Sequence, residues 1–332
     1  MTLMTKSPRG RRRSTVLSAG AAVVAGTVLC SGLGLAGTAA AAPLTHRAAT
    51  ASRATTTVTP ADGGTTASRS DTATEHRNGC IVRTLLTGAF ASPTSAAAQH
   101  LARATVAPDA VTHTPGAAAG PAGVLAEFAA DRKRVPGSQA VVKHLAADGD
   151  LVAVHWQIAP DVRNERRGDA AVDLFRLRNG KVVEHWSLDQ PIATGTPASG
   201  NTNTMFSDLY RAGRPAPAPT ERQEEHNRTL AVSAYDTLFR DHDVSVLDRA
   251  FDPAYLQHNP VAPNGTAALK QLFGSGAQFP AQQSVISLSD GDIVWTFSQP
   301  VGAKPGDPLL AADLFRVDGG LIREHWDVVP TS

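Results

Sequence analysis

The sequence predicts an α+β protein built from two tandem copies of one domain. The run Asp-Leu-Phe-Arg at 173–176 returns at 313–316, and Glu-His-Trp at 184–186 returns at 324–326, both 140 residues later. Seven identical residues at one displacement indicate an internal duplication. In each copy helical patterns precede strand patterns, which favours an antiparallel sheet with N-terminal helices over an alternating βαβ arrangement.

A second match supports the duplication. His113-Thr-Pro pairs with His258-Asn-Pro at a displacement of 145 residues, and the same displacement aligns Gly120 with Gly265. Loop insertions produce such small changes of displacement, so the two matches belong to one repeat.

Hydrophobic periodicity predicts the elements of the second copy. Helices are predicted over 221–240, 244–251 and 267–273. Strands are predicted over 283–288, 293–299, 311–317 and 321–328. In the first copy the last hairpin turns at Asn179-Gly180, a strong signal because both residues of this turn take positive φ.

The first 41 residues have the layout of a cleavable export signal. Five basic residues precede an apolar run over 16–35, and Ala39-Ala40-Ala41 forms a cleavage-type sequence. The Gly, Ser and Thr residues of the run favour cleavage over retention as an anchor. Arg12-Arg13 is similar to a twin-arginine signal, so both export routes stay open. We expect a secreted or extracytoplasmic protein.

Changes of composition divide the rest of the chain. The predicted parts are a Thr/Ala/Ser-rich tether at 42–74, a first domain at 75–206, a Pro-rich linker at 207–220 and a second domain at 221–330. The tether is expected to be disordered, because it holds almost no large apolar residue.

Charge and cysteine content exclude some classes of partner. The chain has 31 Lys and Arg and 30 Asp and Glu residues, and loss of the signal leaves it weakly acidic. Without a Lys/Arg stripe, no nucleic-acid binding is expected. No further membrane-length apolar run follows, so no membrane association is expected after cleavage. Cleavage would also remove Cys30 and leave Cys80 as a lone cysteine, so no intramolecular disulfide is expected.

The motifs resemble those of the bacterial SnoaL-like family of predicted aldol-condensation enzymes, which has the nuclear-transport-factor-2-like fold. Its domains often end in a hairpin of the form D-x-F-R-x-x-x-G-K-x-x-E-H-W-D-x-x-Q, and residues 170–192 and 313–329 are similar to it. The resemblance implies two tandem cone-shaped barrels, each a curved antiparallel sheet packed against N-terminal helices around one small-molecule pocket. The reaction stays open, because this fold hosts several chemistries.

The two copies differ at positions that bear on activity. The first has Ser187 where the family usually has Asp, whereas the second has Phe297 opposite His155 and lacks the Asn-Thr-Met-Phe tail at 203–206. We therefore predict that the first domain is the active unit and that the second is a binding or scaffold copy.

Candidate catalytic residues lie on the last hairpin and its neighbouring strand. An uninterrupted register about the two-residue turn places on one face Asp173, Phe175, Leu177, Val182, Glu184 and Trp186. His185 then lies on the other, outer face, as does His325 in the second copy. In the family's polyketide cyclases an aspartate on this strand is the proposed acid/base, a role that the resemblance carries to Asp173 and Asp313. Burial should raise the pKa of Asp173, and His155 could share proton transfer with it.

The remaining candidates are ligand contacts, each with a structural alternative. The predicted ligand-binding residues are His113, Phe175, Glu184, Trp186, Tyr255, His258, Phe315, Glu324 and Trp326. The two histidines could instead fix turns, the tryptophans could belong to the core, and the glutamates could pair with backbone or arginine. Asp173 could equally form a salt bridge with Arg176.

No metal site and no cofactor are predicted, because there is no His-x-x-x-His, Cys pair or Gly-rich phosphate loop. The leading hypothesis is an exported, cofactor-independent acid/base enzyme, an aldol-type cyclase or isomerase, acting on a small apolar carbonyl compound. The alternative is a non-catalytic protein that binds a small molecule or a partner. Domain pairing within the chain and a homodimer both stay open.

Overall fold

The computed structural model describes residues 69–213, 218–274, 280–304 and 306–330. The predicted signal and most of the predicted tether lie outside the described residues. The end of the tether is helical, because the first helix already begins at Arg69, so the first domain starts earlier than residue 75. No helix in the described ranges is long and apolar enough to cross a membrane.

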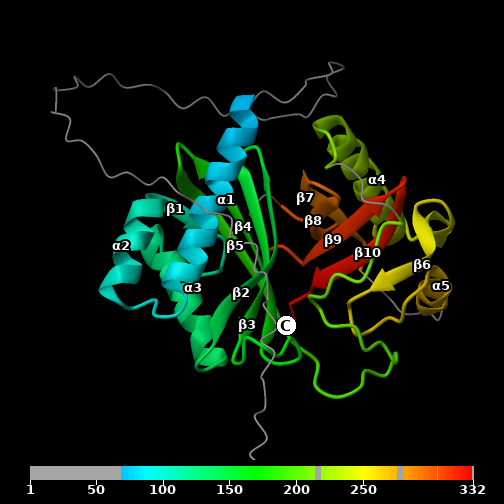
Figure 1. Cartoon of the computed structure of the whole chain (residues 1–332), viewed down its shortest axis with the longest axis horizontal. Helices are drawn as coiled ribbons and strands as arrows, with labels where there is room; N and C mark the ends of the chain where they lie inside the picture. The colour runs from blue at the N-terminus through cyan, green and yellow to red at the C-terminus, as the bar shows by residue number, and fades with distance from the viewer. Residues whose placement is uncertain (1–68, 214–217, 275–279, 305, 331–332) are drawn as a thin grey trace, which may run out of the picture. The chain divides into compact units, whose positions relative to one another are not determined.

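Two repeats with the same order of elements follow each other along the chain (Figure 1). The first repeat consists of α1 (Arg69–Ala89), α2 (Ala96–Thr105), β1 (Val106–Thr112), α3 (Pro121–Arg134), β2 (Gln139–Asp148), β3 (Leu151–Ala159), β4 (Asp169–Arg178) and β5 (Lys181–Pro191). The second consists of α4 (Glu221–Phe239), the 3-10 helix η1 (Val244–Asp248), β6 (Phe251–Gln257), α5 (Thr266–Gly274), β7 (Gln282–Asp290), β8 (Ile293–Pro300), β9 (Ala311–Asp318) and β10 (Leu321–Val328). The prediction of two tandem α+β units is confirmed.

Each repeat forms its own five-stranded sheet, with the strand orders β1-β5-β4-β3-β2 and β6-β10-β9-β8-β7. The edge strands β1 and β6 run parallel to β5 and β10, and the other pairs are antiparallel. The sheets are therefore mixed and are not closed barrels, which corrects the barrel and the all-antiparallel pairing within the predicted fold class while leaving the class itself standing. The sequence pattern misses β1 and β6 because each is short and contains a proline, a residue that is depleted in strands.

Aligned glycines close the same turn in both repeats. Gly120 has a φ of 71°, and its N–H donates to the Ala110 carbonyl at 2.7 Å. A Cβ there would lie 2.3 Å from the Pro108 carbonyl oxygen, so only glycine fits. Gly265 has a φ of 90° and donates to the Tyr255 carbonyl at 2.8 Å. This shared turn explains why the second sequence match includes the two glycines.

The last hairpin of the first repeat turns at Asn179-Gly180 as predicted, with φ values of 52° and 72°. A bulge at Val183 follows, so that Arg176 pairs with Glu184, and the second repeat has a register shift at the same place. A slip of one residue moves every later side chain to the opposite face. The predicted face is therefore wrong beyond the bulge, and His185 shares the face of Asp173.

The helices cover one face of each sheet, which we call the inner face. Apolar side chains of α1, α2 and α3 pack on the inner face of the first sheet, and those of α4 and α5 pack on that of the second. Both sheets belong to one compact unit, and their outer faces share one apolar cluster that includes Leu174, Trp186, Leu314 and Trp326. The two repeats therefore pair within the chain.

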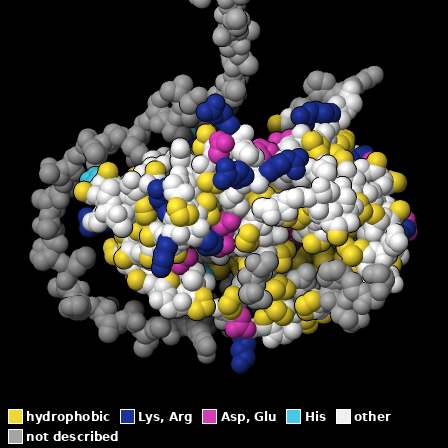
Figure 2. Space-filling model, turned by 90° about the horizontal axis from the view of Figure 1, so that it is seen from below, with side chains coloured by type: hydrophobic (Ala, Val, Ile, Leu, Met, Phe, Trp, Pro, Cys, Tyr) yellow, Lys and Arg dark blue, Asp and Glu magenta, His cyan; other side chains and the backbone are white. Residues whose placement is uncertain are grey.

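Two further observations bear on the predicted partners. On the face shown in Figure 2, Lys and Arg side chains lie among Asp and Glu side chains.

Cys80 on α1 is disulfide-bonded, which contradicts the prediction of a lone cysteine without a disulfide. The other cysteine of the sequence, Cys30, lies outside the described residues.

Candidate active site

A buried carboxylate and imidazole pair recurs at the same position in both repeats. His185 Nε2 lies 2.6 Å from Asp173 Oδ1, and His325 Nε2 lies 3.0 Å from Asp313 Oδ1. All four residues are buried, and each imidazole stacks on the phenylalanine of its own motif. The prediction that these histidines lie on the outer side is wrong, because the bulge turns them inward.

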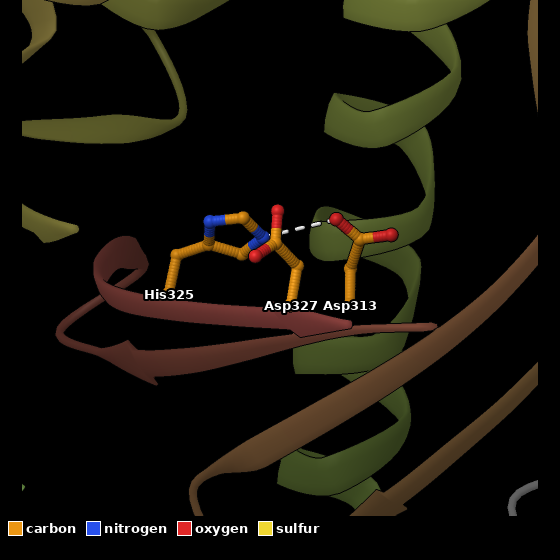
Figure 3. A group of neighbouring side chains, drawn as sticks. All are labelled: Asp313, His325 and Asp327. Carbon is orange, nitrogen blue, oxygen red and sulfur yellow. Dashed lines mark hydrogen bonds and ion pairs between the residues drawn. The ribbon is translucent and has the colours of Figure 1, made fainter. Parts of the chain in front are cut away.

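The second repeat adds another carboxylate to its pair. Asp327 pairs with Asp313 across β9 and β10, where the first repeat has Ser187 opposite Asp173. The side chains of Asp313, His325 and Asp327 project from the same side of the hairpin (Figure 3). Asn259 Nδ2 donates to Asp327 Oδ2 at 2.7 Å. Asp327 was not among the predicted site residues, although the family-like Glu-His-Trp-Asp run is the signal that marks it.

The same group could hold a metal ion, a possibility that no sequence motif indicates. Asp313, His325 and Asp327 each offer one ligand atom, and these atoms lie within 4.8 Å of one another. Imidazole and carboxylate ligands suit several divalent ions. The ligands are spread over two strands, so they form no compact sequence motif.

Strand β6 fixes the other side of the imidazole. His325 Nδ1 lies 3.2 Å from Tyr255 Oη and 3.1 Å from Gln257 Oε1. Gln257 Nε2 in turn donates to Tyr255 Oη at 2.7 Å. Both ring nitrogens are thereby held in place. Tyr255 is a predicted ligand contact, whereas Gln257 was missed because the sequence pattern did not indicate a strand there.

Burial and charge set the protonation of this group. Burial raises the pKa of Asp327 to about 6, against the opposing charge of His325. Burial lowers the pKa of His325, but the hydrogen bond to Asp313 and the nearby carboxylate charges outweigh it, so this pKa is raised. Burial, aided by the carboxylates, raises the pKa of Tyr255 well above its usual value. The group can therefore exchange protons near neutral pH.

A cavity of about 410 Å³ opens beside the group. Ligand pockets commonly measure roughly 300–1,000 Å³. Its apolar walls include Leu238, Phe239, Phe251, Leu269, Phe273 and Phe315. Its polar end holds Asp313, His325, Asp327 and Tyr255, and Gln190 of the first repeat also lines it. The cavity thus brings together three of the predicted residues of the second copy, Asp313, Tyr255 and Phe315.

The equivalent aspartate of the first repeat is closed off. Trp156 Nε1 donates to Asp173 Oδ2, and the Trp156 ring meets Phe90 edge-on at a centroid distance of 4.9 Å. Trp156 is fully buried, and Asp173 is 1% exposed. Phe175 belongs to the same apolar core. Asp173 is therefore enclosed by its neighbours, whereas Asp313 lines a cavity.

His155 does not meet Asp173, contrary to the predicted pairing. His155 pairs with Val172 across the strands, so its side chain lies on the outer face. Its Nδ1 lies 3.1 Å from that of His144, and its ring contacts Phe206. Burial and the His144 charge hold its pKa well below the usual value. The two predicted partners therefore lie on opposite faces of the sheet.

The predicted ligand contacts His113, Glu184 and Trp186 also lie away from the inner face. His113 Nε2 lies 3.0 Å from Glu184 Oε2, and its ring stacks on Trp186 with centroids 4.1 Å apart. The second repeat contains the same arrangement, with corresponding distances of 2.8 and 5.0 Å, in His258, Glu324 and Trp326. The bulge explains why these residues do not join the aspartates.

In the second repeat this outer group holds residues 204–210 of the chain. The N–H groups of Leu209 and Tyr210 donate to Glu324 at 2.6 and 3.2 Å. His258 Nδ1 contacts the Thr204 carbonyl. The tail predicted to belong to the first domain, and the start of the predicted linker, therefore pack on the second repeat.

Comparisons with known proteins match part of the chain to one family. No curated protein matches it. Similar solved structures include a proposed isomerase of the SnoaL-like family from Agrobacterium tumefaciens, with 20% identity and a TM-score of 0.29, covering 35% of this chain and 98% of that one. IdmH, a proposed polyketide cyclase from Streptomyces antibioticus, has 25% identity and a TM-score of 0.28, covering 35% and 93%. Residues 89–185 match the family described as the SnoaL-like domain.

Proposed function

We propose that the chain is a cofactor-independent acid/base enzyme whose active site is the cavity of the second repeat, itself a second SnoaL-like domain. The observation that carries this proposal is Asp313 Oδ2, a buried carboxylate oxygen without a hydrogen-bond partner among the described residues. It lies beside His325 at the polar end of an apolar cavity. Buried polar groups are nearly always partnered, so an unpartnered carboxylate oxygen on a residue that lines a cavity favours a ligand or reactant there.

The substrate class that fits this cavity is a small, largely apolar carbonyl compound. Asp313, oriented by His325, would remove a proton from the carbon beside the carbonyl, which leaves an enolate. Asp327, whose pKa burial raises to about 6, would give a proton to the enolate oxygen in an isomerisation, or to the alkoxide that forms when the enolate carbon attacks a second carbonyl in an aldol-type cyclisation. An isomerisation is completed when the proton held by Asp313 returns to a different carbon and the enol gives its proton back to Asp327.

The first repeat has a supporting role in this proposal. Its aspartate already has a donor on each oxygen, from Trp156 and His185. Ser187 stands where the second repeat has the proton donor Asp327. Both differences favour turnover in the second repeat.

Hydrogen–deuterium exchange tests the proposal without the natural substrate. NMR in D2O would follow the α-protons of 2-tetralone, a small apolar ketone, with the full chain and its Asp313→Asn variant. We expect the wild type to exceed the buffer rate and Asp313→Asn to lose about 100-fold or more. Asp173→Asn is the matched control at the closed site and should retain the rate. If 2-tetralone binds to the folded wild type without exchanging, the enzyme proposal is wrong and a non-catalytic binding protein is favoured.

We also propose that the chain is exported. The five basic residues and the apolar run over 16–35, followed by the cleavage-type sequence Ala39-Ala40-Ala41, support this. Mass spectrometry of the protein from the medium or cell envelope of its host would locate the N-terminus, which we expect near residue 42. Since Cys30 is the only other cysteine, a mature chain that keeps residue 30 would contradict the expected cleavage but not export.

A further inference from the structure

Trp156 and Ser298 occupy the same position in the two sheets. On β3, Trp156 pairs with Ala171 of β4, and on β8, Ser298 pairs with Ala311 of β9. Each alanine lies two residues before the aspartate of the repeated motif. Alternate strand residues share a face, so both side chains belong to the face that carries the aspartate.

In the first repeat the Trp156 side chain provides the second hydrogen-bond donor to the Asp173 carboxylate. Its Nε1–H donates to Asp173 Oδ2, while His185 is bonded to Oδ1 at 2.6 Å. The carboxylate thus has a donor on each oxygen. A planar bicyclic ring fills the space beside it and packs against Phe90.

In the second repeat the residue at the position of Trp156 is Ser298, so β8 places no aromatic ring beside Asp313. His325 is bonded to Asp313 Oδ1 at 3.0 Å, but Oδ2 has no partner among the described residues. Only 4% of Asp313 is exposed. Instead of an indole, the cavity of about 410 Å³ lies beside this carboxylate, and Tyr235, which is next to Ser298, forms part of its wall.

We infer that this cavity binds a planar aromatic molecule of one or two fused rings whose N–H or phenolic O–H donates to Asp313 Oδ2. The first repeat provides the template, because its Trp156 places such a ring and such a donor on the equivalent Asp173. The inference deepens the proposed function by naming the ligand class. It rests on the proposed role of the cavity as a ligand site, and it does not require turnover.

The walls of the cavity suit such a ring. Four phenylalanines line it, namely Phe239, Phe251, Phe273 and Phe315. Aromatic rings pack favourably in offset or edge-to-face arrangements, as Trp156 does against Phe90 in the first repeat. The described lining residues include neither Lys nor Arg. A neutral aromatic donor should therefore bind better than an aromatic carboxylate, which would meet two buried carboxylates and no cation.

Matched probes test the donor. Indole and 1-methylindole differ in one N–H group, and 2-naphthol and 2-methoxynaphthalene differ in one O–H group. Calorimetry on the wild-type full chain should give indole a Kd about 10-fold lower than 1-methylindole, because one hydrogen bond to a carboxylate is gained. The variant Asp313→Leu, which lacks the acceptor, should lose this preference. Equal Kd values of the two indoles for the wild type would overturn the inference.

The first repeat offers an independent test. Trp156→Ala should leave a cavity beside Asp173, and indole should raise the melting temperature of this variant more than 1-methylindole does. Trp295→Ala is the matched control, because Trp295 is buried and its Nε1 has no partner among the described residues. The control should show no preference between the probes. The absence of a preference in folded Trp156→Ala would contradict the template.

The failure of this inference can be told apart from failure of the proposed function. Ketone exchange without any preference for the N–H probe would refute the inference and leave the acid/base function standing. Preferential binding of indole without ketone exchange would support the inference and refute the enzyme.

Discussion

Replacing Trp156 by Phe separates the contribution of its hydrogen bond from that of its ring. Trp156→Phe removes the Nε1 donor and leaves Asp173 Oδ2 buried without its donor, while an aromatic ring can still pack against Phe90. Loss of a hydrogen bond to a buried charged group destabilises by about 1.5–3 kcal/mol. The smaller ring adds a cavity contribution that any buried Trp→Phe change shares.

Trp295→Phe is the control that removes this shared contribution. Trp295 is 1% exposed, and its Nε1 has no hydrogen-bond partner in the described part of the chain. We expect Trp156→Phe to lose about 1.5–3 kcal/mol more free energy of unfolding than Trp295→Phe, measured by circular dichroism in urea. In thermal unfolding this corresponds to a melting temperature about 3–12 °C lower. Equal losses would refute the role of the indole donor and, with it, the template for the ligand.

Three further predictions concern Asp131, Asp327 and Glu324. Burial raises the pKa of Asp131 to about 8, so the folded state keeps a proton that the unfolded state releases near pH 4. The free energy of unfolding should therefore fall as pH rises from about 4 to 8, and Asp131→Asn should flatten this fall in urea titrations. Because the pKa of Asp327 is raised to about 6, ketone exchange should slow as pH rises through that value, and the slower exchange of Asp327→Asn should lack this dependence. The Glu324 carboxylate accepts hydrogen bonds from the N–H groups of Leu209 and Tyr210, so Glu324→Gln should speed proteolysis of the segment 204–210. Glu184→Gln, the matched control in the first repeat, should not change this rate.

The duplication and the last hairpins can be predicted because their signals are local. The repeated motifs stand at a constant displacement, and the Asn179-Gly180 turn needs two positive φ values that this pair adopts readily. Edge strands are harder to predict, because their pairing partner lies far along the chain. For β1 the partner is β5, more than sixty residues away, and the proline within β1 hides its strand character further.

The prediction of which β5 side chains share the sheet face of Asp173 fails because of one residue. The bulge at Val183 has no distinctive sequence signal, yet it decides whether His185 or Glu184 joins Asp173. Both alternatives place a polar side chain beside a carboxylate, so the residue types alone favour neither. An error of one position therefore changed the composition of the predicted site while leaving the predicted fold largely intact.

The prediction that His155 and Asp173 share one site fails for a different reason. His155 in the first copy and Phe297 in the second suggested that the first site was the more complete one. Both residues lie on outer faces, and the next residue along each strand, Trp156 or Ser298, is the one that faces the aspartate. Whether a buried tryptophan fills a site or borders it depends on the packing of helices against the sheet, which residue spacing does not reveal.

The first repeat also supports the cavity of the second. Gln190 on β5 lines that cavity and accepts a hydrogen bond from the Val329 N–H at 3.0 Å. Asn201 Nδ2 donates to the carbonyls of Gln257 and Asn259 at 2.8 and 3.2 Å. Because the side chains of those two residues contact His325 and Asp327, the connection between the repeats holds the backbone that positions this buried group.

One aspartate–histidine pair therefore has two roles in the same chain. In the first repeat the pair is saturated, because the indole of Trp156 satisfies the second carboxylate oxygen, and it stabilises the fold. In the second repeat the same oxygen is buried without a partner among the described residues, the carboxylate lines a cavity, and a third ionisable group is present at Asp327. The presence of the pair alone does not indicate activity, because the side chain two residues along the neighbouring strand differs between the repeats, Trp156 in the first and Ser298 in the second.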